Sequence, residues 1–288
     1  NISVSPQADN AKNSFQVDQA LLSIAYLPKN GFGAAVDVAS GDYNPQGGRF
    51  AGGNGTALTQ AYLQYNSGAL TVQGGRFYTA AGYEVFPVTG NLFVSRSETF
   101  GQESTYHTGV RANYAVSDSL SVVAGVNDGI YNNLDNESSV TKNKAFELGA
   151  NWALTSDLSV ALTGYMGKDA TLVKQSLYSL VASYNVSKDL GLVLNVDKVK
   201  NSDSLVVGNG NATNIALYAT YAVSDKVKAG LRLEEVNPEG SKNNIGAVAA
   251  VVSYAAAKNF DIRTELKDVD AQGKKRQVTG AVQGVLKF

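Results

Sequence analysis

Apolar and polar residues alternate with a period of two along almost the whole chain, whereas the period of an amphipathic helix is almost absent. Successive side chains of a β-strand point to opposite faces, so the pattern predicts strands with one apolar and one polar face. In the run 260–267, Phe260, Ile262 and Leu266 share one face. The opposite face carries four charges of alternating sign, which we expect to meet water: Asp261, Arg263, Glu265 and Lys267.

The connections between these runs alternate in length. Short polar turns, such as Ser117-Asp118-Ser119 and Ser187-Lys188-Asp189, take turns with mostly longer segments. Outer-membrane barrels have this asymmetry, with tight periplasmic turns and longer extracellular loops. The runs span roughly 10–13 residues, above the ~5–6 usual in soluble sheets and near the ~9–11 that cross a bilayer at a tilt. The predicted longer loops are 42–55, 80–105, 131–143, 201–212 and 237–243.

About fifteen strand-like runs follow residue 16, and a barrel with both termini in the periplasm requires an even number. The segment 1–5 alternates too, so we predict that it pairs with the last run. This gives an all-β, antiparallel up-and-down transmembrane β-barrel of about 16 strands, in one domain covering 1–288, although 14 or 18 strands also fit. The alternative is a soluble all-β or β-helix protein, whose one-sided sheets alternate as well.

The composition excludes several kinds of chemistry. The 288 residues include no Cys, one His and one Met, which removes thiolate sites and most histidine-based metal or acid–base sites. The 24 Lys and Arg residues nearly balance the 25 Asp and Glu residues, unlike a nucleic-acid binder. The sequence shows no apolar run that predicts a transmembrane helix, and no leader at its start. We therefore predict no metal, no cofactor and no nucleic-acid partner, in the mature chain of an exported protein.

Several aromatic residues recur near the ends of the predicted strands, beside the short turns. An aromatic girdle at the membrane interface has this placement, although aromatic residues also favour strands in general. We predict that these residues lie at the membrane interface: Tyr26, Tyr65, Tyr114, Trp152, Tyr184, Tyr221 and Phe288.

The segment 70–113 carries a distinctive series of motifs. Gly75-Arg76-Phe77 ends a strand, Gly82-Tyr83-Glu84 follows in a loop, and Ser95-Arg96-Ser97 precedes the strand His107-Thr108-Gly109-Val110-Arg111. The series resembles the OmpL-like porins, the second β-barrel porin family of Gram-negative outer membranes. Members of that family usually begin with a longer first strand than this chain does. The resemblance implies an outer-membrane channel and supplies no particular solute.

The segment 80–105 is our candidate for a constriction folded into the pore, because general porins narrow their lumen with a loop whose charges set ion preference. A surface loop with solvated charges is the alternative. The charged residues of this segment are Glu84, Arg96, Glu98 and Glu103. The candidate pore-lining residues on the barrel wall are Arg76, Arg111, Glu147, Arg232, Asp261, Arg263, Glu265 and Lys267. We also expect replacement of the inward-facing Arg232 by leucine to affect folding very little.

The leading functional hypothesis is passive diffusion of ions and small hydrophilic solutes through a polar lumen. The alternative is a structural barrel that serves as sheath or scaffold for an electron-transfer or secretion partner. We expect an outer-membrane location, contact with lipid including lipopolysaccharide, and a homo-oligomer or a partner protein. An enzyme would need a serine nucleophile held by His107 and an orienting group. Ser104 is near in sequence only, so we predict no catalytic site.

Overall fold

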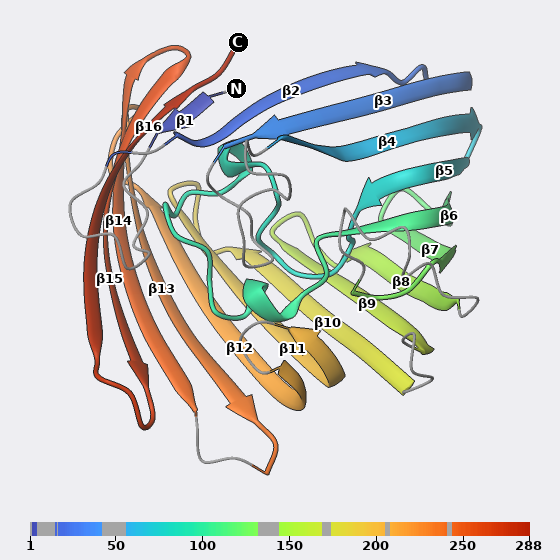
Figure 1. The fold of residues 1–288 in the computed structure, drawn as a ribbon. Helices are drawn as coiled ribbons and strands as arrows, with labels where there is room; N and C mark the ends of the chain where they lie inside the picture. The colour runs from blue at the N-terminus through green and yellow to red at the C-terminus, as the bar shows by residue number, and fades with distance from the viewer. Residues whose placement is uncertain are drawn as a thin grey trace.

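The computed structural model of the chain describes residues 2–4, 15, 17–41, 56–131, 144–168, 174–204, 208–240 and 244–288. Antiparallel strands form nearly all of its regular structure (Figure 1). In chain order the strands are β1 (Ile2–Val4), β2 (Val17–Tyr26), β3 (Gly31–Ser40), β4 (Thr56–Ser67), β5 (Leu70–Tyr78), β6 (Tyr106–Ala115), β7 (Leu120–Asn127), β8 (Ala145–Ala153), β9 (Leu158–Lys168), β10 (Lys174–Asn185), β11 (Leu190–Ser204), β12 (Gly208–Ala222), β13 (Val227–Pro238), β14 (Ile245–Ala257), β15 (Phe260–Ala271) and β16 (Gln277–Leu286).

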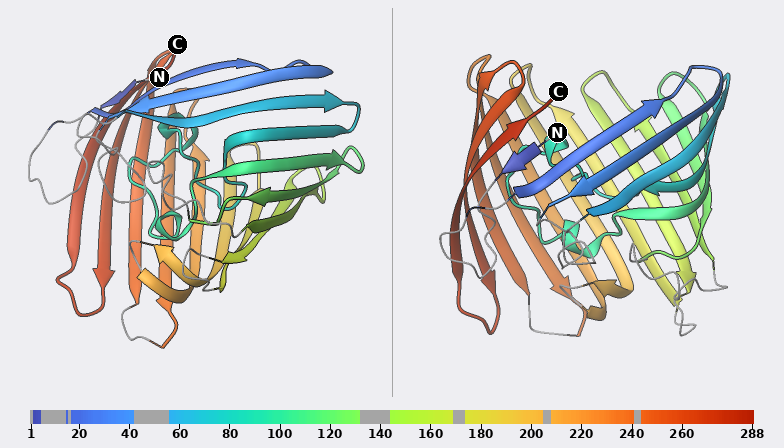
Figure 2. Two further views of the ribbon diagram at one scale, coloured as in Figure 1. Left: turned by 45° about the vertical axis from the view of Figure 1, so that its right-hand side comes forward. Right: turned by 45° about the horizontal axis from the view of Figure 1, so that its top comes forward.

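Each strand pairs with its neighbour in the sequence, and the short first strand closes the sheet into a barrel (Figures 1 and 2). Ile2 lies opposite Leu286 of β16 and opposite Ala20 of β2. Closure matters in a membrane because lipid offers no partner to the polar groups of a free sheet edge. The predicted fold class, the count of 16 strands and the pairing of the first strand with the last are therefore confirmed.

The short turns owe their shape to a repeated hydroxyl group. In four of them, the side chain of the first turn residue accepts a hydrogen bond from the backbone N–H three residues later, at 3.0–3.2 Å. Ser and Thr favour turns because their hydroxyl can replace a backbone acceptor in this way. The four pairs are Ser117 with Leu120, Thr155 with Leu158, Ser187 with Leu190 and Ser224 with Val227.

One predicted loop is wrong. Most of the segment 201–212 belongs to strands, because β11 continues to Ser204 and β12 begins at Gly208, directly opposite it. The alternation is lost there because a hairpin extending beyond the bilayer needs no apolar face, so its sequence resembles a loop. The segments 42–55, 132–143 and 241–243 lie outside the described residues, and so do the loops that we predicted in them.

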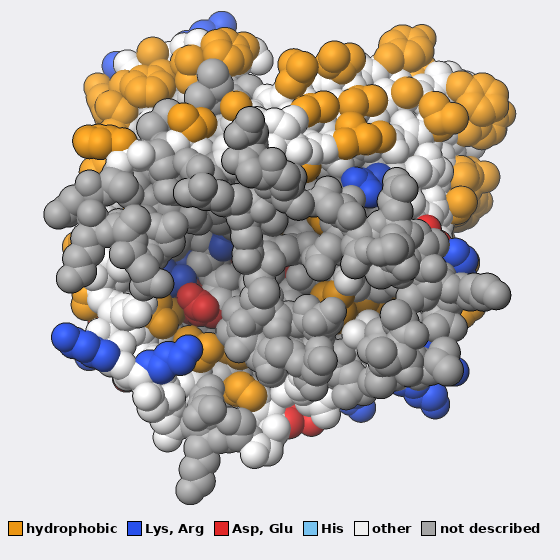
Figure 3. Space-filling view, viewed as in Figure 1, with side chains coloured by type: hydrophobic (Ala, Val, Ile, Leu, Met, Phe, Trp, Pro, Cys, Tyr) orange, Lys and Arg blue, Asp and Glu red, His pale blue; other side chains and the backbone are white. Residues whose placement is uncertain are grey.

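The two faces of the wall differ sharply in exposure. Outward-facing Leu63 and Leu266 leave 68% and 63% of their surface exposed, whereas inward-facing Arg232 and Glu265 leave 0% and 2%. Figure 3 shows hydrophobic side chains spread over the outer surface of β2–β4, at the top of the view. An outer surface with so many large apolar side chains suits hydrocarbon, while the charged inner face requires polar partners or water.

The described residues also contain two short 3₁₀ helices, η1 (Val88–Gly90) and η2 (Phe100–Gln102), which both lie in the connection from β5 to β6. Among the residues that the structure describes, no helix has the length and apolar character needed to span a membrane.

The assigned faces predict opposite effects for the same substitution. Leu231 faces outward on β13, so Leu231→Arg should lower the free energy of unfolding by roughly 2–4 kcal/mol. Ser183 faces inward on β10, so Ser183→Arg should cost much less. Urea unfolding in lipid vesicles measures both values, and equal losses would contradict the assigned faces.

Candidate functional site

The connection between β5 and β6, residues 79–105, lies inside the barrel (Figures 1 and 2). Its backbone donates hydrogen bonds to inward-facing side chains of five separate strands, β2, β9, β10, β13 and β15. Gly82 N–H donates to Ser179 Oγ of β10 at 2.9 Å. Val88 N–H donates to Gln19 Oε1 of β2 at 3.1 Å. Val94 N–H donates to Glu265 Oε2 of β15 at 2.7 Å. Because residues 79–105 contact strands on different sides of the barrel, they cross the lumen, and we call them the inner segment.

Arg232 on β13 is the principal anchor of the inner segment. Its guanidinium forms ion pairs with Glu84 of the segment, at 2.9 Å, and with Glu234 of its own strand, at 3.0 Å. It also donates to the carbonyl oxygen and the hydroxyl of Ser95, both at 2.9 Å, and to the carbonyl oxygen of Arg96 at 3.1 Å. Arg232 is fully buried, so its charge depends on these protein partners rather than on water.

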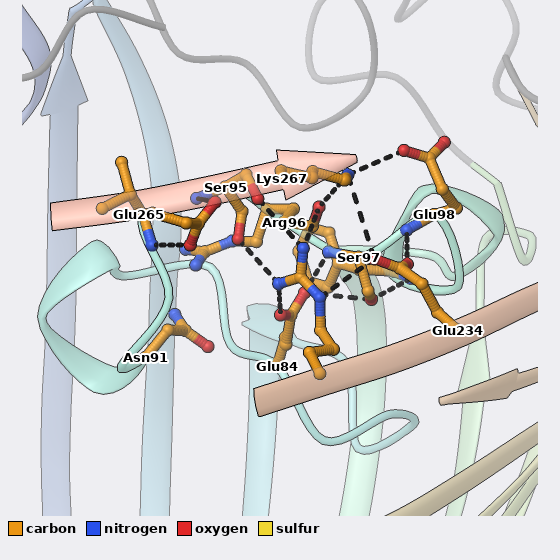
Figure 4. Close-up of polar contacts among 12 residues, drawn as sticks. Glu84, Asn91, Ser95, Arg96, Ser97, Glu98, Glu234, Glu265 and Lys267 are labelled. Atoms are coloured by element: carbon orange, nitrogen blue, oxygen red, sulfur yellow. Dashed lines mark hydrogen bonds and ion pairs between the residues drawn. The ribbon is translucent and has the colours of Figure 1, made fainter. Parts of the chain in front are cut away.

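Lys267 and Glu265 on β15 add a second set of anchors beside Arg232 (Figure 4). The Lys267 ammonium donates to Glu98 Oε1 at 2.8 Å and to the carbonyl oxygen of Arg96 at 3.0 Å. The Glu265 carboxylate accepts the backbone N–H of Ser95 at 3.1 Å. Charge-assisted bonds of this kind are about twice as strong as neutral ones, which favours a fixed inner segment.

The inner segment is also braced internally. Glu84 Oε2 accepts the backbone N–H of Ser97 at 2.8 Å and the hydroxyl of the same residue at 3.1 Å. The Asn91 amide donates to the carbonyl oxygens of Val85 and Pro87 at 2.8 and 2.9 Å. Glu84 therefore joins the fold of the segment to its attachment at Arg232.

A second polar cluster holds the beginning of the inner segment. The Arg111 guanidinium of β6 pairs with Glu147 of β8 at 2.8 Å and lies 4.2 Å from the ring centre of Phe77. The Tyr165 hydroxyl donates to Glu147 at 2.9 Å and accepts the backbone N–H of Ala80 at 3.0 Å. The cluster fixes the point where the chain leaves the wall.

His107 is 1% exposed and lies at the other end of the inner segment. Its Nε2 is 3.1 Å from Ser104 Oγ, its Nδ1 is 3.4 Å from the carbonyl oxygen of Gly129, and its ring stacks on Tyr165 at 4.2 Å. The group next to Nδ1 is a carbonyl rather than a carboxylate, and Ser104 is as buried as His107. This geometry ties the end of the segment to the wall.

Glu103 and Asp197 bring two buried carboxyl groups together where η2 meets β11, with Asn195 beside them. Burial and the neighbouring Asp197 carboxyl raise the pKa of Glu103 well above its usual value. Gly82 packs against the Glu103 carboxyl group with a φ of +83°, so a side chain at Gly82 would both collide and be strained. Docking of this end of the segment therefore favours a protonated Glu103.

The other predicted wall residues divide into inward and outward groups. Asp261 faces inward and pairs with Lys287 at 3.2 Å. Arg263 donates to the carbonyl oxygen of Val88 at 3.2 Å and to Gln283 Oε1 at 3.4 Å, which attaches η1 to the wall. Gln19 and Ser179, which also hold the segment, were not predicted, because uncharged residues at inward positions do not stand out in a sequence.

The prediction for Arg76 is wrong. Arg76 lies opposite Ala61 of β4 and Thr108 of β6. Thr108 shares a face of β6 with the outward-facing Val110, so Arg76 faces outward too. Its guanidinium donates to the Leu58 carbonyl oxygen at 2.9 Å. The two glycines before Arg76 carry no side chain that marks a face, and the second has a φ of +132°. The sequence therefore gives no reliable face at this position.

The predicted interface aromatics lie on the outer face, with exposed fractions from 40% for Tyr65 to 87% for Phe288. Most of them occupy register positions next to the short turns, as Trp152 does opposite Leu120. Phe32 lies on the same outer face, directly opposite Tyr65, and was not predicted; its ring centre lies 4.8 Å from that of Tyr65. The other predicted tyrosines are exposed as well: Tyr26, Tyr114, Tyr184 and Tyr221.

A closed barrel of antiparallel strands, apolar outside and charged inside, with a connection folded into its lumen, defines a β-barrel of the porin class. The model of the family described as "Putative beta-barrel porin-2, OmpL-like" matches residues 2–284. The chain therefore belongs to this family, as the motifs of 70–113 indicate, and it is an outer-membrane porin.

Solved outer-membrane proteins share the fold over nearly their whole length. The outer-membrane channel DcaP of Acinetobacter baumannii is 13% identical, with a TM-score of 0.67, covering 100% of this chain and 94% of DcaP. OmpT of Vibrio cholerae, in its trimer form, is 16% identical, with a TM-score of 0.69 and coverage of 100% and 96%. OprB of Pseudomonas putida is 14% identical, with a TM-score of 0.70 and coverage of 100% and 92%. No curated protein matches the sequence significantly.

The expectation that leucine can replace Arg232 at little cost does not fit this geometry. The change leaves the Glu84 carboxylate buried without its cation and leaves Glu234 only Lys267, at 3.9 Å. Removing one partner of a buried pair costs roughly 3–5 kcal/mol, so we predict a loss of that size for Arg232→Leu. Urea unfolding in lipid vesicles measures it. Arg276→Leu removes an exposed pair with Asp268 and serves as control, with a much smaller loss. Equal losses would show that Arg232 does not anchor the segment.

The pKa of Glu103 predicts a pH dependence. A carboxyl group whose pKa is raised by folding favours the folded state while it is protonated, and that contribution is lost as the pH rises through the folded-state pKa. The melting temperature of the natural protein should therefore fall, relative to that of Glu103→Gln, as the pH rises above about 4.3, the ordinary glutamate value. Glu235→Gln, on the outer face, is the control. If the melting temperatures of the natural protein and of Glu103→Gln changed with pH in the same way, the raised pKa of Glu103 would be contradicted.

Proposed function

We propose that the inner segment forms a fixed constriction in a water-filled channel for ions and small hydrophilic solutes. The observation that carries the proposal is the buried guanidinium of Arg232, which holds Glu84 and Ser95 of the segment against the far wall. Fixed charges of both signs in a narrow passage set ion preference, and a polar wall replaces part of the solute's hydration.

The free part of the lumen has uncharged polar walls. Beside the short turns, inward-facing polar residues of β4–β8 stay at least partly accessible. The charged pair Arg111 and Glu147 farther along these strands is buried, and so are five inward charges of β13 and β15: Arg232, Glu234, Arg263, Glu265 and Lys267. Gln64 and Gln73 join in a hydrogen bond of 3.0 Å on this side, and Asn113 and Asn151 continue the polar lining. Amide groups of this kind suit hydrated solutes without strong preference for one charge.

We propose that the exposed aromatics form the girdle at the periplasmic membrane interface. The shared position of these residues beside the short turns supports the proposal, since the amphipathic rings of Tyr and Trp favour the headgroup region. The exposed Tyr26 on β2, Trp152 on β8 and Tyr221 on β12 place such rings on well-separated strands of the barrel.

We further propose that the protein assembles as a homo-oligomer, most simply a trimer. The shared fold with OmpT of Vibrio cholerae, solved in a trimer form, supports this arrangement. Native mass spectrometry of the detergent-extracted protein tests it, and a monomer under mild extraction would contradict it.

Planar-bilayer recording tests the channel directly. We expect discrete conductance steps from the purified protein. Glu98→Gln removes the nearer carboxylate partner of the Lys267 ammonium and leaves only Glu234, at 3.9 Å, so the reversal potential in a salt gradient should shift toward anion preference. Glu235→Gln changes the same type of residue on the outer face and should leave the reversal potential unchanged.

The same recording separates the channel from a sheath. Insertion into the bilayer without conductance would support a barrel filled by its inner segment or by a partner protein. Conductance with no shift for Glu98→Gln would show that ions pass elsewhere than beside the Lys267 anchor.

A further inference from the structure

A basic groove opens on the outer surface at the extracellular ends of β8–β11. It has a volume of about 700 Å³. Phe146, Met166 and Tyr178 contribute apolar and aromatic surface to it. Figure 3 shows basic side chains at the lower right, over the ends of β9 and β10. The lysines that line the groove are Lys144, Lys168, Lys174 and Lys200.

The register of the strands concentrates positive charge in this groove. Lys168 lies directly opposite Lys174, and Lys200 lies opposite Ser176, one outward position along β10 from Lys174. Like charges directly opposite each other on a sheet are destabilising. Among the described residues, Lys168 and Lys200 make no ion pair, whereas Lys144 pairs with Asp128. An anion bound beside Lys168 and Lys200 would offset this repulsion.

The apolar part of the groove lies directly beneath the lysines. Phe146 and Met166 are opposite each other on the outer face, and both are well exposed, at 57% and 40%. Met166 is one outward position below Lys168 on β9, so the basic row ends where the apolar belt begins. A ligand that fills the groove therefore presents anionic groups at the extracellular end and hydrocarbon toward the middle of the bilayer.

We propose that this groove binds a phosphorylated glycolipid of the outer leaflet, the lipid A part of lipopolysaccharide. Its phosphate groups lie among Lys168, Lys174 and Lys200, and an acyl chain runs along Phe146 and Met166. Lysine is an effective point-charge partner for phosphate. Charge complementarity and the position of the groove at the boundary of the apolar belt favour a lipid over free phosphate, which gains nothing from the apolar floor. The proposal depends on the outer-membrane location and is independent of an open lumen.

The test measures lipid binding by the full-length protein in detergent with EDTA present, from the concentration dependence of the melting temperature. The probes are bisphosphorylated lipid A, the same lipid after dephosphorylation, and inorganic phosphate. The groove variant is Lys168→Ser/Lys174→Ser/Lys200→Ser. The matched control removes three exposed lysines of the periplasmic turns: Lys188→Ser/Lys226→Ser/Lys258→Ser.

The natural protein and the control should bind bisphosphorylated lipid A at least about tenfold more tightly than the dephosphorylated lipid, which equals about 1.4 kcal/mol. The groove variant should lose that preference while it migrates as a folded barrel and keeps its single-channel conductance. Equal binding of both lipids by the natural protein would overturn the proposal. So would full retention of the preference by the groove variant, or stabilisation by inorganic phosphate equal to that by lipid A.

Discussion

A peptide group inside a bilayer has no water to bond, so every backbone N–H and C=O of a spanning segment needs a partner in the protein. Strands meet this requirement only when the sheet has no free edge, and here the three residues of β1 close it against β2 and β16. Once the sheet is closed, the period of two along each strand separates an outer face for lipid from an inner face for water. The outward aromatic side chains and the inward charges follow from that separation.

The inner face then poses a problem of its own, because charges removed from water need partners. The inner segment supplies them: Glu84 and the carbonyl groups of Ser95 and Arg96 surround the buried Arg232. The same contacts hold the segment across the lumen, so one set of ion pairs neutralises the wall and supports the constriction that we propose. Such buried pairs are costly to break, which favours a constriction that does not move during permeation.

Much of this architecture could be predicted from the sequence because alternation reports the face of each residue. The first strand, the strand count and the inward charges of β15 were identified in this way. The face of Arg76 was missed because Gly74 and Gly75 carry no side chain to mark it. The contact of Arg232 with Glu84 was missed because it joins residues 148 positions apart, and periodicity says nothing about which inward residues meet across a lumen.

The absence of cysteine from the chain permits a direct test of a fixed constriction. A Cβ at Gly230 of β13 would lie 2.9 Å from Leu92 Cδ2 of the inner segment and 2.8 Å from Val251 Cγ1 of β14. Leu92→Cys/Gly230→Cys removes the first overlap, needs a small shift of the Val251 side chain, and brings two thiols close to each other. The decisive measurement is the single-channel conductance of this variant with the disulfide formed and after its reduction. A segment already docked at the wall predicts that the bond forms readily and that the two conductances are equal. Failure of the bond to form, or a large increase in conductance on reduction, would contradict the account.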